Sequence, residues 1–497
     1  MKKLILSILI SLSFCSNTFT QNIYYSDAKD VAKNKIKLLG MNNSHSINNN
    51  VNIIDDINNQ PLFFVFELVP SGYIIVTSNK MLPPVIAYSF KSNFINDDNI
   101  QNPLKEMLIA DIESRMLSID IISEETIEKR KQEWDNLLMG QNRKSNLFQQ
   151  WPEGGTTSTG GWLETNWTQS SPYNIYCPID PITSQRSYVG CPATAMAQIV
   201  NYYEVINSTK FTNDDDYYHS YAGRNFWIDD DYEEQDFLSF PIINVFLDSI
   251  ATKYEIHKQL TTDEKAALSF ACGVAARQVF TSEGSGTFGV DQAFDAYMKF
   301  GFIDAILMES NDTNMFNIMS QNMMEARPVH LAVVTEQWDS GHNIVVDGYN
   351  TDNYYHVNFG WGGSNNGWYL LPEEIPYNLT VVEGAIVDIA YPPVYTNIYN
   401  NPISNPISIG IYPNPASDFI NIELNLIDFK EINVSIMDLS GRIIYIANQN
   451  SITKHNKQEF SLDLNSVLRG TLSPGLYLLK VETNGDIAIG KFEVRKN

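Results

Sequence analysis

A cysteine and a histidine in this chain have surroundings that could let them react as a pair. Cys191 stands in SYVGCPATAMAQIVNYY, directly before Pro192, where a glycine-led loop runs into an apolar, alanine-rich segment. Because proline suits the first turn of a helix, Cys191 is expected at the N-cap or just ahead of it. The unpaired amides and the dipole of a helix N-terminus favour thiolate over thiol, which predicts a lowered thiol pKa and a nucleophile. A cysteine used only for packing is the alternative, and a nearby base would decide between the two.

Histidine is the side chain best suited to take a proton from a thiol near neutral pH. Four of the seven histidines lie in polar or charged segments and are expected at the surface: His45, His219, His257 and His455. His330 lies within RPVHLAVV and is expected to be a buried strand residue. The other two, His342 and His356, fall in SGHNIVVDGYNTDNYYHVNFGWGGSNNGWYLL, which predicts two antiparallel strands around an Asn/Asp turn.

The register of this hairpin brings an aromatic ring to His342. With the turn centred on residues 351–352, counting outward along both strands places His342 opposite Trp361. A slip of one or two residues would bring Phe359 opposite and Asn358 near the ring. A cysteine–histidine pair works best when a third group fixes the imidazole and an aromatic ring shields its hydrogen bond from water. Asn358 and Trp361 are the candidates for orienting His342.

Acyl transfer also needs donors to the oxyanion that forms at the substrate carbonyl, commonly a main-chain amide beside the nucleophile and a side-chain amide. The amide of Cys191 serves as the first. In NWTQSSPYN, Gln169 stands before a Pro-Tyr-Asn turn that could hold its carboxamide in a cleft. A glutamine that is merely solvated in a loop is the alternative.

The order of these motifs resembles that of the streptopain family of papain-like cysteine peptidases. WTQSSPYN, VGCPATAMAQI, GSGTFG, RPV, GHNIVVDGY and YYHVNFGWGGSNNGWY follow one another within residues 162–392. The resemblance implies a papain-like fold, with Cys191 as nucleophile, His342 as base and Gln169 as oxyanion donor.

One departure from the family pattern affects the group that orients the base. Phe359 stands where the family often has an orienting tryptophan, so the resemblance leaves that role to Asn358 or Trp361. The loop SEGSGTFGV resembles the glycine- and serine-rich rim of the family's substrate cleft, and a flexible surface turn is the alternative. The substrate-binding residues implied are Ser285, Gly286 and Gly341.

Changes in composition and in the spacing of apolar residues along the chain predict an α+β protein with several domains. MKKLILSILISLSFCSNTFTQ, with two lysines before an apolar run, is typical of a secretory signal peptide; a lipoprotein site at Cys15 is disfavoured by the bulky Phe14. The next part, with a hairpin around residues 70–72 and a charged helical stretch, resembles the family's inhibitory propeptide, to be cut near residues 140–160. The predicted boundaries are 1–21 signal peptide, 22–150 inhibitory propeptide, 151–393 papain-like catalytic domain, 394–410 linker and 411–497 β-sandwich.

The C-terminal part alternates in short strands with turn signals, which predicts a small β-sandwich. IYPNPASDFINIEL, IMDLSGRIIY, GLYLLKV and GKFEVRKN resemble the sorting domain of the type IX secretion route. The resemblance implies the type IX machinery as a partner. An accessory binding sandwich is the alternative.

The composition of the chain argues against several classes of partner and against a metal site. With 33 basic and 58 acidic side chains the formal charge is -25, which disfavours nucleic acid and anionic membrane surfaces. No window after the signal is long and apolar enough to span a membrane. No His-Glu-x-x-His motif occurs, and the acidic runs NDDDYY and IDDDYEEQD are expected to be solvated loops, so neither a metal nor a cofactor is predicted. Removing the signal leaves three cysteines, so at least one thiol is unpaired; Cys272 is expected to be buried.

Together these features predict a secreted cysteine endopeptidase made as a zymogen. It would be exported through the periplasm, act outside the cell or at its surface, and hydrolyse peptide bonds of proteins or peptides through a thioester, with its own propeptide as inhibitor. Two alternatives stay open. The same fold could act as an amidase or acyltransferase on cell-wall peptides, or as a non-catalytic adhesin.

Overall fold

The chain forms two compact units, residues 1–394 and 395–497. The predicted signal peptide lies outside the described residues, as does most of the predicted linker. The computed structural model describes residues 22–95, 103–140, 148–334, 341–371, 382–390, 409–424, 432–437, 443–449, 453–454, 457–464, 474–482 and 487–495.

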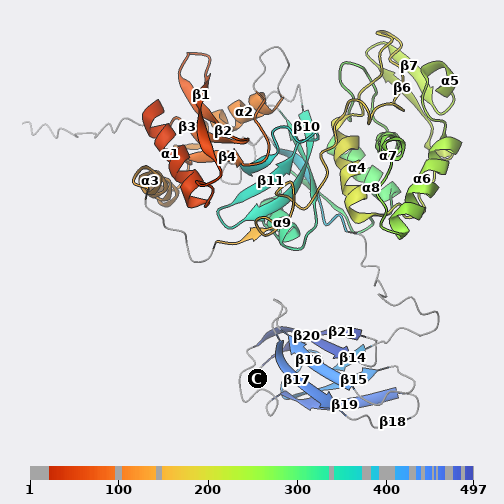
Figure 1. Cartoon of the computed structure of the whole chain (residues 1–497). Helices are drawn as coiled ribbons and strands as arrows, with labels where there is room; N and C mark the ends of the chain where they lie inside the picture. The colour runs from red at the N-terminus through yellow and green to blue at the C-terminus, as the bar shows by residue number, and fades with distance from the viewer. Residues whose placement is uncertain are drawn as a thin grey trace, which may run out of the picture. The chain divides into compact units, whose positions relative to one another are not determined.

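A long antiparallel sheet organises the first unit (Figure 1). Within the described residues its order is β1-β2-β3-β4-β12-β11-β10-β9-β13-β8, and β5 also pairs with β10. Its strands are β1 (Ser46–Asp55), β2 (Pro61–Val69), β3 (Tyr73–Thr77), β4 (Val85–Ser89), β5 (Gln150–Trp151), β8 (Ile306–Glu309), β9 (Val329–Val334), β10 (Gly341–Asn350), β11 (Tyr354–Asn358), β12 (Gly367–Leu370) and β13 (Val382–Val387).

The sheet continues from the propeptide region into the catalytic region. Strands β1 to β4 come from the first region, where β2 and β3 form the hairpin predicted around residues 70–72. Strands β8 to β13 come from the second, and the two meet where β4 pairs with β12, with Tyr88 opposite Trp368. The propeptide region is therefore joined to the catalytic region by main-chain hydrogen bonds as well as by side chains.

Helices cover both faces of this sheet. On one face, α1 and α3 pack on the propeptide strands and α4 packs on β10. The opposite face carries α2 and α9, whose apolar side chains join a core with β2, β3, β10 and β11. The remaining helices form a separate helical lobe around α4 and α7, and β6 and β7 make a hairpin on that lobe. The bounds are α1 (Tyr25–Leu38), α2 (Pro103–Ser118), α3 (Glu124–Leu138), α4 (Cys191–Tyr203), η1 (Asn213–Asp215), β6 (Tyr217–Tyr221), β7 (Arg224–Ile228), α5 (Tyr232–Gln235), α6 (Phe240–Glu255), α7 (Thr262–Ala275), α8 (Val290–Lys299) and α9 (Met315–Met324).

The hairpin of β10 and β11 forms as predicted, except at its turn. Tyr349 pairs with Tyr355, so the turn is one residue longer than a turn centred on residues 351–352 would make it. The extra residue, Asn353, has φ 64°, a left-handed conformation that asparagine tolerates better than most residues.

A β-bulge at Asp347 compensates for the longer turn. Beyond the bulge, Val345 pairs with Asn358. Continued along both strands, that register sets His342 opposite Trp361, the pairing predicted from the sequence. The Asp347 carboxylate stabilises the bulge, because it accepts a hydrogen bond from His356 Nδ1 at 2.6 Å and both side chains are buried.

The second unit has two sheets in its described residues, with orders β14-β15-β19-β18 and β17-β16-β20-β21. Apolar side chains of both sheets share one core, so the sheets face each other, as in the predicted β-sandwich. Its strands are β14 (Ile409–Tyr412), β15 (Phe419–Leu424), β16 (Ile432–Met437), β17 (Ile443–Gln449), β18 (Thr453–Lys454), β19 (Lys457–Asp463), β20 (Gly475–Glu482) and β21 (Ile487–Val494).

The predicted fold class, α+β with a strand-rich C-terminal part, is therefore confirmed. In the part of the chain that the structure describes, every helix is too short or too polar to cross a membrane.

Candidate active site

Cys191 is the first residue of α4. Gly190 precedes it as the N-cap with φ 90°, and Pro192 lies in the first helical turn. A Cβ at position 190 would lie 2.8 Å from Gln278 Oε1, so glycine is needed both for the backbone conformation and for the space. The sulfur is thus held at the start of a buried helix, close to the position that the sequence predicts.

The surroundings of the Cys191 thiol raise its pKa in this structure. Burial raises the pKa of Cys191, while hydrogen bonds from the main chain and side chain of Asn343 and from its own N–H act in the opposite direction. The lowered pKa expected at a helix N-terminus is therefore wrong for this state, because desolvation of the thiolate outweighs those donors. The other two mature cysteines, Cys177 and Cys272, are free and buried, as expected for Cys272.

Asn343 is the side chain that reaches the sulfur. Its Nδ2 donates to Cys191 Sγ at 3.9 Å, and its Oδ1 accepts from His330 Nε2 at 2.7 Å. The hydroxyl of Tyr297 donates to the other ring nitrogen of His330 at 3.1 Å. Burial lowers the pKa of His330 to about 4, so the ring is neutral at neutral pH with its proton on Nε2. This buried chain of contacts fixes the Asn343 amide with its nitrogen toward the sulfur.

His342 lies on the opposite face of β10. It shares the face of Ile344 and Val346, which belong to the core with α2 and α9, whereas Asn343 is on the face of α4. His342 Nε2 donates to the main-chain oxygen of Phe359 at 2.8 Å. Burial lowers the pKa of His342 to about 4, and the bond to Phe359 opposes that shift. Among the described residues, the side-chain donor to the sulfur is Asn343, so the expected sulfur–imidazole contact is not made in this state.

The predicted neighbours of His342 divide into two groups. Trp361 stacks on the imidazole with ring centroids 4.6 Å apart, and Phe359 supplies the main-chain acceptor. Asn358 makes its contacts elsewhere: its Nδ2 donates to the main-chain oxygen of Thr165 at 2.9 Å, and its Oδ1 accepts from Gly360 N. Asn358 therefore holds the loop ahead of Gln169 in this state and does not orient His342.

Gln169 is placed near Cys191 through its main chain. Its carbonyl accepts from the amide of Val189 at 2.8 Å, two residues before the cysteine. The preceding residues are anchored by Gln198, whose Oε1 accepts from Thr165 Oγ1 at 2.9 Å and from the amide of Trp167 at 3.1 Å. Gln198 also accepts from Asn358 and so ties the loop to α4.

The loop that contains Ser285 and Gly286 borders the start of α4. A Cβ at Gly286 would lie 4.0 Å from Pro192 Cδ, which places the loop beside the cysteine. Ser285 is turned inward: its Oγ accepts from the amide of Thr281 at 2.9 Å. Gly341, the third predicted substrate-binding residue, is exposed at the start of β10 and pairs with Val334.

A buried carboxylate organises this loop. Asp180 accepts from Arg224 Nε at 2.8 Å and from the amide and hydroxyl of Ser282, both at 2.9 Å. Burial alone would raise the pKa of Asp180, but hydrogen bonds from Ser282, Ile182 and Arg224 outweigh it and lower that pKa to about 2. The carboxylate stays charged at all ordinary pH values.

The surface prediction for His219 is wrong. The residue is 1% exposed, and its Nε2 accepts from the amide of Phe280 at 2.7 Å. Its ring stacks on Phe226 with centroids 4.3 Å apart. His219 therefore supports the segment that leads to the cleft rim, which its polar neighbours in the sequence do not reveal.

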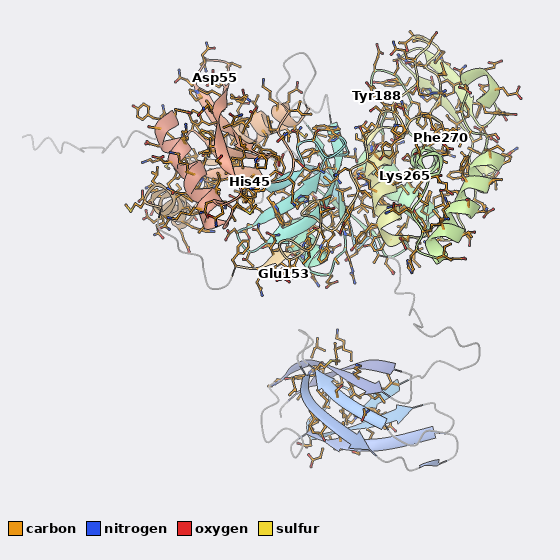
Figure 2. The ribbon with its side chains drawn as sticks, in the orientation of Figure 1. His45, Asp55, Glu153, Tyr188, Lys265 and Phe270 are labelled. Atoms are coloured by element: carbon orange, nitrogen blue, oxygen red, sulfur yellow. The ribbon has the colours of Figure 1, made fainter. Side chains whose placement is uncertain are left out.

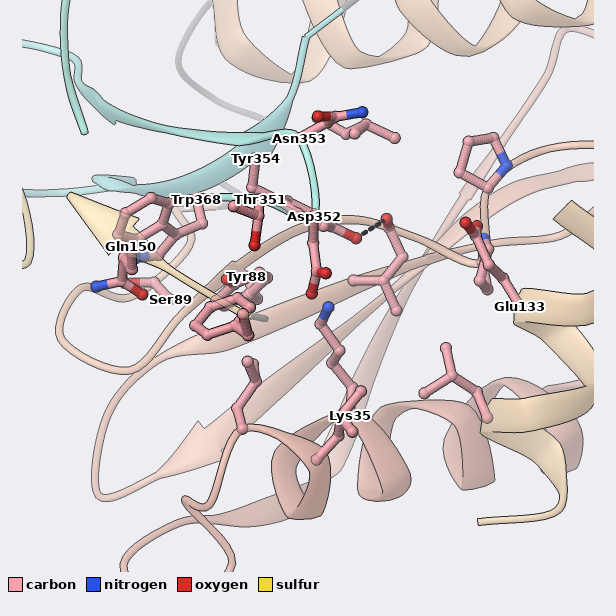
Figure 3. A pocket seen from close by; sticks show the side chains of 18 of the residues that line it. Lys35, Tyr88, Ser89, Glu133, Gln150, Thr351, Asp352, Asn353, Tyr354 and Trp368 are labelled. Atoms are coloured by element: carbon pink, nitrogen blue, oxygen red, sulfur yellow. Dashed lines mark hydrogen bonds between the residues drawn. The ribbon is translucent and has the colours of Figure 1, made fainter. Parts of the chain in front are cut away.

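The propeptide region and the catalytic hairpin enclose a cavity of 790 Å³ (Figure 3). Lys35 of α1 is buried there, with Nζ 5.1 Å from the ring centre of Tyr88 and 4.6 Å from that of Tyr354. Burial lowers the pKa of Lys35, and the charges of Asp352 and Glu133 oppose that shift. Because Cys191 is not among its lining residues, this cavity is a contact region between the two parts and not the substrate cleft.

The sequence reasoning missed two residues that shape this site, Gln198 and Asn343. Gln198 is a polar residue on an otherwise apolar helix, seven residues after Cys191 and hence two turns along the same face. Asn343 is a polar residue in β10, and the residues that follow it in this strand are buried and apolar. Within the described residues no cluster of acidic, histidine or cysteine side chains is arranged to hold a metal ion. The side chains present, a thiol at a helix start and an imidazole on the neighbouring strand, suit acyl transfer.

Three family models match separate parts of the chain. The Peptidase C10 family matches residues 167–369, the Spi protease inhibitor matches residues 20–114, and the secretion system C-terminal sorting domain matches residues 410–495. The first range contains Gln169, Cys191 and His342.

Two curated proteins are similar over much of the chain. The thiol protease/hemagglutinin PrtT of Porphyromonas gingivalis is 27% identical over 399 residues, which are 77% of this chain and 41% of that protein. The chain thus spans less than half the length of PrtT. Streptopain of Streptococcus pyogenes serotype M1 is 24% identical over 344 residues, which are 65% of this chain and 77% of streptopain.

Two solved structures are also similar. A fragment of Prevotella intermedia prointerpain A has a TM-score of 0.47 at 21% identity and covers 70% of this chain and 99% of its own. The active interpain A cysteine protease has a TM-score of 0.34 at 24% identity, covering 46% and 94%. The sequence matches carry the assignment: the chain contains a Peptidase C10 domain between an inhibitor-like propeptide and a secretion sorting domain.

Proposed function

We propose that this protein is a cysteine endopeptidase, made as a latent precursor and exported, that cleaves peptide bonds of protein substrates. The observation that carries the proposal is the Peptidase C10 match across Gln169, Cys191 and His342, with Cys191 at the start of α4 beside β10. In this chemistry the thiolate attacks the substrate carbonyl and forms a thioester, and His342 protonates the leaving amine. Water then hydrolyses the thioester.

The main-chain amide of Cys191 and the carboxamide of Gln169 are the proposed oxyanion donors. Trp361 is the proposed cover of the base, supported by its stacking on His342. Asn358 acts on the loop before Gln169 through Thr165 and is proposed as a positioning residue. Ser285, Gly286 and Gly341 are proposed to border the bound substrate.

The described state is that of the precursor. Its propeptide region is continuous with the catalytic sheet, and the Nε2 atom of its base is hydrogen-bonded to the carbonyl of Phe359. Activation then requires cutting in the connector at residues 140–160, of which residues 141–147 lie outside the described part of the chain. In the active enzyme the His342 imidazole is proposed to contact the Cys191 sulfur.

The C-terminal sandwich is proposed to direct export by the type IX machinery, after passage through the periplasm, to the cell surface or the medium. The support is the sorting-domain match over residues 410–495. The domain boundaries proposed from the sequence, 22–150, 151–393 and 411–497, are kept as proposals.

Self-processing tests the proposal. Residues 22–497 are expressed, and the products are followed by mass spectrometry beside Cys191→Ala and a matched Cys272→Ala variant. The wild type and Cys272→Ala are expected to convert themselves and to digest casein, and an epoxide inhibitor is expected to label Cys191. Digestion of casein by Cys191→Ala at the wild-type rate would refute the proposal. Release of peptides from cell-wall material, with casein left intact, would favour an amidase instead.

A further inference from the structure

The cavity between the propeptide region and the catalytic region has no part in the proposed peptidase chemistry (Figure 3). Its volume of 790 Å³ is within the range of pockets that bind small molecules, and such pockets often lie between domains. Helices α1 and α3 and strand β4 line it on one side, and strands β11 and β12, with residues 154–160, line it on the other. On the propeptide side the lining residue Phe90 is fixed by His45, whose Nε2 donates to the Phe90 carbonyl at 3.1 Å (Figure 2).

One wall of the cavity is a row of rings on a single face of the sheet. Tyr88 of β4 is the register partner of Trp368 of β12, and Trp368 is the partner of His356 of β11. Partners in adjacent strands point to the same face, and the ring contacts agree: the centroids of Tyr88 and Trp368 are 6.5 Å apart, and those of Trp368 and His356 are 5.3 Å apart. Tyr354, two residues before His356, has its ring 5.1 Å from that of Tyr88. The four rings form one connected wall, and all of them line the cavity.

A buried ammonium group lies over this wall. Lys35 is 5% exposed, and its Nζ is 5.1 Å from the ring centre of Tyr88 and 4.6 Å from that of Tyr354. Figure 3 shows its side chain directed from α1 into the cavity. Burial lowers the pKa of Lys35, and Asp352 and then Glu133 oppose this shift through their charge alone. Among the described residues the ammonium has neither a hydrogen-bond acceptor nor an ion pair. A buried charge without an acceptor is costly, so Lys35 lacks a partner that a ligand can supply.

At the other end of the wall, two ring nitrogens converge on Gly160. A Cβ placed at Gly160 would lie 3.4 Å from His356 Nε2 and 4.0 Å from Trp368 Nε1, so both nitrogens border the space left by the missing side chain. His356 Nδ1 donates to Asp347 at 2.6 Å, which leaves Nε2 as an acceptor. In the part of the chain that the structure describes, neither His356 Nε2 nor Trp368 Nε1 has a hydrogen-bond partner. One donor and one acceptor side by side suit a hydroxyl group, which can satisfy both.

The charge around the cavity favours an anion. Arg115 lines the cavity but is paired with Asp111, so it does not contribute. The other lysine, arginine and acidic residues of the lining are four basic and two acidic ones: Lys35, Lys91, Lys129, Arg130, Glu133 and Asp352. In the whole chain the balance is the reverse, with 33 basic and 58 acidic residues. An excess of basic residues in this lining therefore indicates a ligand with negative charge.

We propose that the cavity binds a small aromatic carboxylate that also carries a hydroxyl group. The carboxylate accepts from the Lys35 ammonium, and the ring of the ligand lies along the aromatic wall. At the other end the hydroxyl accepts from Trp368 Nε1–H and donates to His356 Nε2. Two residues of β11, about 7 Å at the rise of a strand, separate the two ends of the wall, a distance that one hydroxyphenyl carboxylate spans.

Such a ligand joins the two regions of the first unit. Lys35 belongs to the propeptide region, whereas Trp368 and His356 belong to the catalytic region. Binding is therefore expected to stabilise the precursor, because a ligand that binds only the folded state shifts the equilibrium toward it. The inference goes beyond the proposed endopeptidase function and does not rest on it.

Calorimetry on the Cys191→Ala precursor, residues 22–497, tests this site. The probe is para-hydroxyphenylpropionate. It is compared with phenylpropionate, which lacks the hydroxyl, and with para-hydroxyphenylpropionamide, which lacks the charge. The full probe is expected to bind about tenfold more tightly than either analogue, since each analogue lacks one polar contact in a buried site. The full probe is also expected to raise the melting temperature of the precursor.

Two variants separate the two ends of the site. Lys35→Met removes the ammonium, so the preference for the acid over the amide is expected to disappear while the preference for the hydroxyl remains. Gly160→Ala places a Cβ in the space that the two ring nitrogens border, so the preference for the hydroxyl is expected to disappear instead. The matched controls are Lys37→Met, at an exposed lysine of α1, and Gly40→Ala, where φ is 76° and no atom lies within 4 Å of a Cβ. Both controls should bind like the starting precursor.

Two results would overturn the inference. One is no binding of the full probe at millimolar concentration, which would mean that the cavity takes up water only. The other is an unchanged preference for the acid in Lys35→Met. If Lys35→Met does not fold, the loss or survival of the hydroxyl preference in Gly160→Ala decides. None of these measurements needs peptidase activity, so a failure here leaves the proposed function intact, and a precursor that does not process itself can still bind the probe.

Discussion

Near the nucleophile, two neighbouring residues of β10 lie on opposite faces of the strand. Successive side chains of a strand point to opposite faces, so His342 and Asn343 cannot both face Cys191. In this structure Asn343 does, held by His330, while His342 is bound to Phe359. The sulfur is thus contacted by an amide on one face of the strand, while the imidazole is bound on the other.

Trp361 is expected to matter for rate more than for substrate binding. Replacing it with leucine removes the ring stacked on His342, so the imidazole loses both its orientation and its cover from water. For the self-processed enzyme, we expect kcat on a peptide derived from casein to fall by about 10²-fold. This is the order of a general acid–base contribution. KM is expected to change little, and the acid limb of the kcat profile to shift. Trp227→Leu, a tryptophan outside the cleft, is the control and should leave these values unchanged.

Asp180 is expected to stabilise the loop at the cleft rim. Asp180→Asn removes the charge that pairs with Arg224 inside the protein and should lower the free energy of unfolding by about 3 kcal/mol, as breaking a buried ion pair does. KM should rise, because the hydrogen bonds to Ser282 weaken. Urea unfolding and peptide kinetics measure both. Asp236→Asn, which breaks an exposed pair with Arg186, should cost under about 1 kcal/mol; equal losses in the two variants would count against this role.

The helix α4 and the hairpin of β10 and β11 position the reactive groups for different reasons. α4 begins where it does because Gly190 and Pro192 favour that start locally. The hairpin depends on a distant contact: the amide of Leu163 donates to the Asp347 carboxylate at 3.0 Å, and a Cβ at Gly161 would come within 2.2 Å of that carboxylate. A small residue far away in the sequence thus allows the bulge that sets the register of the base.

Gly190 and Gly155 form a matched pair for testing the start of α4. Both have positive φ, 90° and 86°, but a Cβ at Gly190 would lie 2.8 Å from Gln278, whereas at Gly155 no atom lies within 4 Å. Backbone strain is therefore similar, at about 1 to 2 kcal/mol. Gly190→Ala is expected to displace Cys191 and to abolish epoxide labelling and self-processing. Gly155→Ala should keep both, with a modest loss in melting temperature; loss of labelling in both variants would show that strain alone is responsible.

Considered as one body, the first unit joins the propeptide region and the Peptidase C10 region through a shared sheet. Apolar residues of helix α2 in the propeptide region belong to the same core as Ile344 and Val346 of β10, so the two regions share a hydrophobic core as well as a sheet. The unit also buries His330 and His342 in neutral form. This makes its stability depend on pH in a predictable direction.

Acid is expected to destabilise the precursor. Both histidines have a folded-state pKa of about 4, below the ordinary 6.5, so the unfolded chain takes up protons first as the pH falls. Their contribution to stability is complete above pH 6.5 and is lost as the pH falls toward 4. The loss amounts to up to about 3 kcal/mol for each histidine.

Urea unfolding of the full-length Cys191→Ala precursor at pH 7.5 and pH 5, followed by tryptophan fluorescence, measures this loss. The fluorescence reports on the first unit, because all eight tryptophans precede residue 394. His330→Gln and His342→Gln should each reduce the pH dependence. A dependence equal to that of the starting precursor in both variants would contradict the assignment of the effect to these histidines.

Local patterns in the sequence were sufficient for several features of the site. Gly190 and Pro192 predict the helix start, because capping depends on the dihedral angles of a few adjacent residues. The alternation of apolar residues predicts the hairpins and the C-terminal sandwich. The stacking of Trp361 on His342 was also predicted, although the turn and the bulge that combine to produce this register were not.

Long-range packing settled the rest. Asn358 contacts Thr165 and Gln198, His219 is buried under Phe280, and Asn343 faces the sulfur. Each of these contacts depends on which element packs on a given face of the strand or helix. The side-chain types within one segment do not determine which element that is. The amino-acid sequence specified which groups could react; which side chain of β10 contacts the thiol was decided by the packing of α4 on one face of that strand and of α9 on the other.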